Sequence, residues 1–403
     1  MDKMSGYKTQ NTSLMEPMLI PLASAQRAEL TELAFELAKL SSGFYGRLPA
    51  AARENLTDAV RGMNCYYSNL IEGHNTHPIS IENALRKDFS NEPGKRNLQL
   101  EANAHIAVQR WLDEGGAAHS ETTTETIQEM HRRFCELLPP ELLKVSDPQT
   151  GEVFDVIPGK FRDRLVVVGT HLPIDPGHIP VFLTRFDQVY SPLSDAEAVI
   201  AAAGAHHRLL WIHPFLDGNG RVARLMSHAM LSRRLNSGGL WSIARGMARS
   251  VETYKRLLAE CDAQRMGDLD GRGNLSEAKL VNFTRFFLET CIDQVRFMEA
   301  LMKPETLRAR ILIWAREEIA ANRLPDKATR ILEALLYRGE LHRSETNELL
   351  GVSDRQARRI VAELEKTGAI GSVSPRAALK LRFPYGLATR WLPGLYPALP
   401  DDE

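Results

Sequence analysis

The sequence HPFLDGNGRVAR, residues 213–224, lies between two stretches of helical periodicity and decides the fold of the chain around it. Upstream, apolar residues recur at helical spacing from Asp195 to Ile212, which predicts a helix. Pro214 then ends this helix, because proline lacks the backbone N–H that the next turn needs. Downstream, a second apolar stripe predicts a new helix that begins near Arg221. The fold is therefore expected to hold a short loop between two packed helices.

This loop has the composition of an anion-binding site. Gly218 and Gly220 allow positive φ angles and a close approach of the backbone to a ligand. The N–H groups of the turn then point into a concavity at a helix N-terminus, which suits an anion. Arg221 and Arg224 add guanidinium groups for phosphate oxygens. Asp217 is an unusual neighbour for a phosphate unless a cation lies between them, and Mg²⁺ is the natural candidate.

His213 adds a group that titrates near neutrality and can accept a proton from an attacking hydroxyl. The alternative is a tight corner between two helices, where His213 caps one helix, Asn219 forms the turn and the arginines pair with surface acids. Any one of these residues alone favours that alternative. Together, within twelve positions, they favour a site that holds a nucleoside polyphosphate and moves part of it.

The run resembles the signature of the Fic family, His-Pro-Phe-x-[Asp/Glu]-Gly-Asn-Gly-Arg-x-x-Arg, with every fixed position filled. The resemblance implies a mostly helical fold and the transfer of AMP from ATP to a protein hydroxyl. It implies that His213 is the general base, that Asp217 holds Mg²⁺ and that Arg224 orients the γ-phosphate. The other phosphate contacts implied by the resemblance come from Gly218, Asn219, Gly220 and Arg221.

An upstream motif, YYSNLIEGHN at residues 66–75, bears on the control of this site. Read alone, it is the end of a helix, with Gly73 just beyond the last turn and Glu72 in solvent. However, Ser68, Glu72 and Gly73 resemble the [Ser/Thr]-x-x-x-Glu-[Gly/Asn] inhibitory motif of Fic proteins. In that interpretation Glu72 pairs with Arg224 and leaves the α-phosphorus of ATP misplaced. A misplacement of about 1 Å costs on the order of a hundredfold in rate.

Residues 158–173, PGKFRDRLVVVGTHLP, are β-prone and bounded by glycine and proline. They resemble the Fic flap, a β-hairpin that clamps the target side chain, and an edge strand there can bind a peptide through main-chain hydrogen bonds. An ordinary structural hairpin is the alternative. The basic residues Lys160, Arg162 and Arg164 are either solvated or face an acidic surface of the target. The residues assigned to target binding are Lys160, Phe161, Arg162, Val167, Val168 and Gly169.

Residues 240–254 also resemble the family, and Tyr254 is a candidate to stack on adenine. The alternative is a core aromatic on the helix that contains Tyr254. The adjacent residues His206 and His207 are not expected to bind a metal together, because neighbouring side chains diverge on a helix.

The composition is that of an ordinary globular protein. The 403 residues suffice for two or three domains, and 43% of them are hydrophobic. A net charge of −1 provides no whole-chain basic field for nucleic acid. The four cysteines show no C-x-x-C spacing, which favours reduced thiols in a cytoplasmic protein. The polar start lacks a signal core, and no apolar run is long enough for a membrane span.

The fold class is expected to be mainly α, in three regions. Residues 1–118 form a helical region that carries the inhibitory helix, although about the first 25 residues are expected to be poorly ordered. Residues 119–303 form the helical Fic core with its small β-hairpin flap, and residues 304–403 a connecting helix and a winged helix-turn-helix domain. The helices expected in the first region are Ala25–Lys39, Ala51–Glu72 and Leu98–Leu112.

The last region is expected to hold three helices, at Lys327–Tyr337, Arg343–Leu350 and Ser353–Thr367, and then a strand, a turn and a strand. This order resembles a winged helix-turn-helix, with the third helix in the recognition position. A protein-interaction or dimerisation module is the alternative. The basic residues of the third helix that would meet phosphates or bases are Arg355, Arg358 and Arg359.

The leading hypothesis is a protein adenylyltransferase that moves AMP from ATP, with Mg²⁺, to a Ser, Thr or Tyr hydroxyl of a target protein or of the chain itself. One alternative is an enzyme that removes AMP from a modified protein, with Glu72 positioning a water. Another is a DNA-binding regulator whose Fic site only senses a nucleotide. A homodimer is compatible with the sequence, and no membrane partner is expected.

Overall fold

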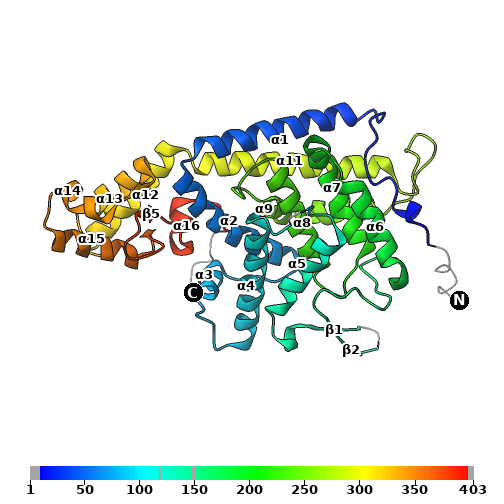
Figure 1. Cartoon of the computed structure of the whole chain (residues 1–403), viewed down its shortest axis with the longest axis horizontal. Helices are drawn as coiled ribbons and strands as arrows, with labels where there is room; N and C mark the ends of the chain where they lie inside the picture. Colours follow the sequence, from blue (N-terminus) through cyan, green and yellow to red (C-terminus); the bar gives the residue numbers. More distant parts are fainter. Residues whose placement is uncertain (1–9, 118, 148–149, 398–403) are drawn as a thin grey trace.

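The computed structural model describes residues 10–117, 119–147 and 150–397, and α-helices make up most of it (Figure 1). In the described residues the strands are two or three residues long and form two small antiparallel sheets. The expected mainly α fold is confirmed. A broad body contains the first two regions of the chain, and a narrower lobe at one end contains α12 to α15.

The described part of the first region, residues 10–117, contributes four α-helices. Helix α1, Arg27–Arg47, lies along α11, Glu277–Leu301, at one edge of the molecule (Figure 1). Helix α2, Ala50–Ile71, enters the body and matches its predicted bounds within one residue. Helix α4, Pro93–Asp113, begins earlier than predicted. Helix α3, Pro78–Leu85, was not predicted, although its proline occupies the first helical position, where no N–H is needed.

The expectation of disorder before α1 is wrong for residues 10–26. A 3₁₀ turn, η2, spans Thr12–Met15, and the side chains of Met15 and Met18 are fully buried. The carbonyl of Met18 accepts a hydrogen bond from the hydroxyl of Tyr190 at 2.8 Å. This segment therefore closes the core through apolar burial, while residues 1–9 lie outside the described part of the chain.

Helices α7 and α8 form the centre of the second region. Helix α7 spans Asp195–Ile212, as predicted, and the Ser194 hydroxyl caps it by accepting the N–H of Glu197. Helix α8 spans Asn219–Arg234 and packs along α7. The other elements of this region are α5 Thr124–Glu136, η3 Pro140–Leu142, β1 Lys144–Ser146, β2 Val153–Asp155, η4 Pro176–His178, α6 Ile179–Tyr190, α9 Ile243–Arg249, α10 Val251–Glu260 and α11.

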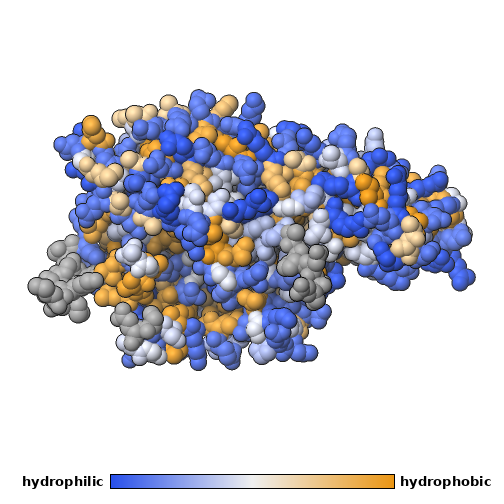
Figure 2. All heavy atoms as spheres, turned by 180° about the vertical axis from the view of Figure 1, so that it is seen from behind, coloured by the Kyte–Doolittle hydropathy of each residue, from blue (hydrophilic) through white to orange (hydrophobic). Residues whose placement is uncertain are grey.

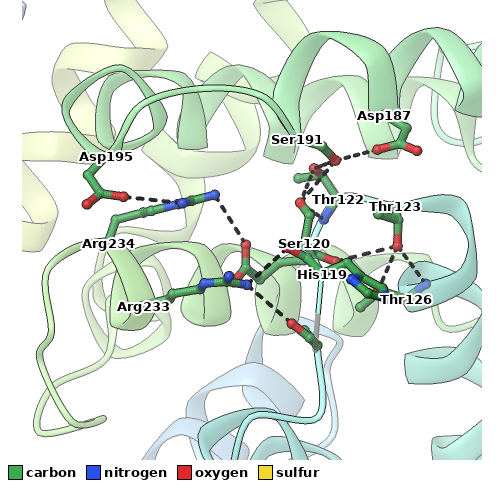
Figure 3. A network of polar contacts seen from close by, with 12 residues as sticks. His119, Ser120, Thr122, Thr123, Thr126, Asp187, Ser191, Asp195, Arg233 and Arg234 are labelled. Atoms are coloured by element: carbon green, nitrogen blue, oxygen red, sulfur yellow. Dashed lines mark hydrogen bonds and ion pairs between the residues drawn. The ribbon is translucent and has the colours of Figure 1, made fainter.

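A polar network fixes the far end of α8 (Figure 3). Arg233 Nη1 lies 3.1 Å from one carboxylate oxygen of the buried Glu121, and Arg234 Nη2 lies 3.9 Å from the other. Arg234 also pairs with Asp195 at the start of α7. Basic residues in the last turn of a helix also interact favourably with its dipole. Ser120 and Thr122, on either side of Glu121, exchange hydroxyl hydrogen bonds with Ser191 at the end of α6.

The C-terminal region begins with α12, Pro304–Ala320, and contains the predicted three helices followed by two strands. A short strand that was not predicted, β3, completes a three-stranded sheet of order β3-β5-β4. The winged helix-turn-helix assignment stays a prediction. The elements are α13 Ala328–Arg338, β3 Glu340–Leu341, η5 Arg343–Glu345, α14 Thr346–Leu350, α15 Asp354–Lys366, β4 Ile370–Gly371 and β5 Leu379–Leu381.

The last residues that the structure describes return to the first region (Figure 1). After β5, helix α16, Tyr385–Trp391, brings the Tyr385 side chain against Gly62 in the middle of α2. The ring of Tyr396 meets that of Tyr66 edge-on, with 5.6 Å between centroids. Arg245 donates a hydrogen bond of 2.8 Å to a carbonyl, that of Gly394. The last described residues are therefore part of the packing around α2.

The face of the molecule shown in Figure 2 is mostly hydrophilic, with scattered hydrophobic patches. Among the described residues, no helix combines the length and the apolar character that crossing a membrane requires. The cysteines Cys65, Cys135, Cys261 and Cys291 are all buried, and each is free.

We predict that Gly62→Ala lowers the free energy of unfolding by about 1–3 kcal/mol, the usual cost of overpacking. A Cβ at this position would lie 1.2 Å from the Tyr385 Oη and 2.4 Å from its Cζ. Gly46→Ala in α1 is the matched control, because a Cβ there meets nothing within 4 Å. Urea unfolding of both variants checks the prediction, and equal midpoints would contradict it.

Candidate active site

The loop between α7 and α8 is held by its own residues. His213 ends α7 in the left-handed conformation, with φ 51° and ψ 63°, and its N–H bonds to the carbonyl of Leu209. The side-chain amide of Asn219 accepts the N–H of Phe215 at 3.0 Å and donates to its carbonyl at 2.8 Å. Gly218, with φ +80°, caps α8. These hydrogen bonds fix the conformation of the loop. The first N–H groups of α8 have no partners within the helix and face out of the loop.

Gly220 differs from the prediction. It lies in the first turn of α8 with a helical backbone, so a positive φ is not the reason for glycine at this position. Its missing side chain matters instead, because a Cβ would lie 2.2 Å from Oε1 of Glu72. Glycine here leaves room for a group beside the helix N-terminus.

His213 is half-buried at the mouth of the loop. Burial, and then the positive charge of Arg162, lower the pKa of His213 to about 4, below the near-neutral value expected from its residue type. The imidazole is therefore neutral at pH 7. A neutral imidazole has a free lone pair, which a general base requires.

Arg224 makes the contact that the upstream motif predicts. Its Nε donates to the Ser68 hydroxyl at 2.8 Å, and its Nη2 donates to the carbonyl of Ser68 at 3.2 Å and to Glu72 Oε1 at 2.5 Å. The guanidinium is buried, whereas the Glu72 side chain is 35% exposed. Burial raises the pKa of Glu72, but the charges of Arg224, Arg221 and Lys255 outweigh it and lower the pKa overall. Glu72 is thus an ionised carboxylate beside the loop.

The end of α2 positions Glu72. Gly73 follows with φ +88°, and its N–H bonds to the carbonyl of Leu70, while that of His74 bonds to Asn69. This is the glycine-terminated helix end that the sequence predicts. The chain then turns away, with the Glu72 side chain toward α8.

Arg221 is held by residues that the sequence analysis missed. Its Nη2 lies 3.2 Å from Glu101 Oε2 on α4, and the ring nitrogen His74 Nδ1 lies 2.7 Å from the same oxygen. The guanidinium also lies over the ring of Phe134 at 5.0 Å. One signal was present, because α4 carries polar residues at helical spacing on a buried face. These residues are Glu101, His105 and Gln109.

Asp217 fits a magnesium ligand. Its side chain is 58% exposed at the mouth of the loop, and the nearest cationic atom paired with it, Arg221 Nη1, is 4.0 Å away. Mg²⁺ in nucleotide sites takes one or two carboxylates together with phosphate oxygens and water. An accessible carboxylate next to a helix N-terminus matches this donor set.

The flap differs from the predicted hairpin. Residues 158–173 contain no strand, and the antiparallel pairing is limited to one bridge, in which Val168 and His171 exchange hydrogen bonds of 3.0 and 2.9 Å around Gly169, φ +58°. The paired strands β1 and β2 precede this segment. The side chains of Val167 and Val168 are exposed.

Arg162 was assigned to solvent or to a target, and this assignment is wrong. The side chain is buried and donates to the carbonyls of His213 at 2.7 Å and Ile174 at 2.5 Å. It therefore joins the start of the flap to the loop. Lys160 is exposed and pairs with Asp163 at 3.3 Å, and the Phe161 ring packs near that of Phe215.

His131 makes a second connection between the flap and the loop. Its ring stacks on Phe215, with centroids 3.9 Å apart, and Nδ1 accepts the N–H of Gly159 at 2.9 Å. Burial lowers the pKa of His131 to about 4. The neutral ring can therefore keep accepting this hydrogen bond. Nothing in the sequence around His131 marked this role, because the stacking depends on the packing of α5.

Tyr254 lies in the core, where its ring is not accessible for stacking on a nucleotide. It is 2% exposed, and its hydroxyl bonds to His206 Nε2 at 2.8 Å. Its ring also meets the ring of Phe283 in the core. The core alternative is therefore the right one, because α10 turns this residue inward toward α7 and α11.

Residues 121–231 match the model of the Fic/DOC family. Over 115 residues the chain is 40% identical to the protein adenylyltransferase Fic of Drosophila willistoni and 36% identical to that of Drosophila erecta. Each match covers 28% of this chain and 20% of the relative, so the chain spans about a fifth of the length of these relatives. A fragment of Fic-1 from C. elegans shares the fold, with 20% identity and a TM-score of 0.52 over 68% of this chain and 73% of that one.

We predict that Tyr254→Phe leaves ATP affinity unchanged within about twofold and lowers the free energy of unfolding by about 1 kcal/mol, because it removes one buried hydrogen bond to His206. Calorimetric titration with ATP and urea unfolding measure the two effects. A clear loss of ATP affinity with unchanged stability would instead place Tyr254 in the nucleotide site.

Proposed function

We propose that the chain is a protein adenylyltransferase that moves AMP from ATP to a Ser, Thr or Tyr hydroxyl of a target protein, and that Glu72 inhibits it. The observation that carries the proposal is the contact of Glu72 and Ser68 with Arg224, at the end of the loop that holds His213. The loop carries groups that suit a polyphosphate. The Glu72 carboxylate would compete with phosphate for one of its arginines, Arg224. The named activity of the Drosophila relatives supports the reaction type.

The reaction needs little covalent participation by the protein. The hydroxyl oxygen of the target bonds to the α-phosphorus, its proton passes to the neutral imidazole of His213, and the bond to the bridging oxygen breaks, which releases pyrophosphate. The N–H groups at the start of α8 and the guanidinium of Arg221 stabilise the phosphate charge. Positioning and electrostatics therefore supply most of the rate, as in other phosphoryl-type transfers.

Asp217 is the residue that would hold Mg²⁺. The ion, when bound, would neutralise part of the charge on the phosphates. The exposed carboxylate of Asp217 lies 4.0 Å from Nη1 of Arg221, so the ion and the guanidinium would both act on the phosphate charge.

Inhibition follows from competition for one guanidinium. A γ-phosphate needs the Nη2 of Arg224, which Glu72 occupies at 2.5 Å. The ionised carboxylate also repels a phosphate. ATP would therefore bind with its terminal phosphate displaced and its α-phosphorus out of line with the attacking hydroxyl.

A second candidate is removal of AMP from a modified protein at the same site. The observation that favours it is the exposed part of the ionised Glu72, which can hold a water molecule. A third is DNA binding by the C-terminal region. It is favoured by the exposed arginines Arg355, Arg358 and Arg359 on α15.

We predict that Glu72→Gly raises the incorporation of label from α-labelled ATP into protein at least about tenfold, because Arg224 becomes free for phosphate. Adding His213→Ala should lower this signal by about a hundredfold or more, the usual contribution of general base catalysis. The assay compares α- and γ-labelled ATP with Mg²⁺, using self-modification as the readout.

Label from the γ-position would show a kinase-like transfer and overturn the proposal. The same Glu72→Gly variant tests the second candidate, since AMP removal from modified protein should be lost. Sequence-specific DNA binding that changes with ATP, without any transfer of label, would favour the third.

We also predict that the Glu72→Gly enzyme keeps its rate as the pH falls from 8 to 6. A lowered pKa means that His213 stays neutral below the ordinary value of about 6.5 and loses its lone pair only near pH 4. An ordinary histidine would lose about tenfold at pH 5.5. Initial rates at saturating Mg²⁺ and ATP check this, and a decline centred near pH 6.5 would refute it.

A further inference from the structure

Each of the two arginines of the loop is in contact with a carboxylate, and the two carboxylates differ in kind. Glu72, on Arg224, is partly exposed and lies at the end of a helix. Glu101, on Arg221, is 11% exposed and lies within α4, in the interior of the body. The first can leave its arginine through a small movement of the chain, whereas the second is fixed by the packing of α4.

Glu101 defines where the guanidinium of Arg221 points. The Nη2 faces Glu101, at 3.2 Å, and the Nη1 lies on the side of Asp217 at the mouth of the loop. The ring of Phe134 covers the guanidinium at 5.0 Å. A planar guanidinium held at one edge and across one face has little freedom left. Its remaining edge is then presented toward the phosphate site before any ligand binds.

Glu101 also contacts the segment that carries Glu72. His74 follows two residues after Glu72, and its Nδ1 is 2.7 Å from the same Glu101 oxygen that contacts Arg221. The same ring nitrogen lies 3.3 Å from Nη2 of Arg221, so His74, Glu101 and Arg221 form one cluster. The residues around Gly73 are thus held at both ends, by Arg224 through Glu72 and by Glu101 through His74.

We propose that Glu101 is the positioning residue for Arg221, and that His74 couples the inhibitory segment to it. Loss of the His74 contact loosens the end of α2 and weakens the hold of Glu72 on Arg224. Loss of the Glu101 charge frees Arg221 and impairs phosphate binding, whatever the state of Glu72. This inference rests on the proposed function, and it assigns opposite effects to two residues that touch one another.

The experiment uses the full chain with His74→Ala and Glu101→Gln, each alone and combined with Glu72→Gly. His74→Ala should raise α-label incorporation about three- to tenfold in the otherwise natural chain. It should change the rate of the Glu72→Gly variant less than about twofold, since there is nothing left to release. His77→Ala is the matched control, because His77 caps α3 and has no contact with Glu101.

Glu101→Gln should raise the KM for ATP, and the Kd measured by calorimetry, about tenfold or more in the Glu72→Gly variant. Asp113→Asn is the control, because Asp113 is another buried carboxylate of α4 that pairs with an arginine, Arg61, away from the loop. Asp113→Asn should lower stability without changing ATP affinity. A merely structural role for Glu101 predicts the same result for both variants.

Three outcomes decide the matter. Unchanged ATP affinity in Glu101→Gln overturns the positioning role, and an unchanged rate in His74→Ala overturns the coupling. If Glu72→Gly transfers no α-label, while Glu101→Gln still weakens ATP binding, the proposed function fails but the positioning role stands. The binding measurement thus separates the two claims.

Discussion

The site depends on two buried arginines. A guanidinium removed from water needs hydrogen-bond acceptors and negative charge close by. Arg221 and Arg224 lie one turn apart on α8, and each draws a different helix toward the loop. Glu101 brings α4, and Glu72 with Ser68 brings the end of α2. The first region of the chain therefore supplies the carboxylates that pair with both arginines of the loop.

Burial acts on the histidines in the opposite way. Burial lowers the pKa of His213, His131 and His206, and this holds all three rings in the neutral form. Each neutral ring then serves as a hydrogen-bond acceptor or a base. The positive charge of the site is thus concentrated on α8, where phosphate would bind, while the surrounding imidazoles add none.

The sequence predicted the parts of the site that depend on local rules. Helix α7 has the predicted bounds because apolar periodicity and Pro214 define it. Gly73 follows the end of α2 with a φ of +88°, a conformation that favours glycine. The Glu72 contact was predicted from the family resemblance. Long-range packing was not predictable in this way. Arg162 looks like a surface residue in sequence, yet it is buried because the carbonyls of His213 and Ile174 converge on it. Tyr254 was misassigned and Glu101 was missed. In both cases the reason is that the inward face of a helix depends on the elements packed against it.

The return of the chain end to α2 has a consequence for how this protein can vary. Tyr385 fills the space that Gly62 leaves open, and Tyr396 rests on Tyr66, ten residues or fewer before Glu72. The packing of α2 therefore depends on the side chains of the C-terminal region. A sequence that exchanges its C-terminal region for another must also change the middle of α2, so these two distant segments are expected to diverge together.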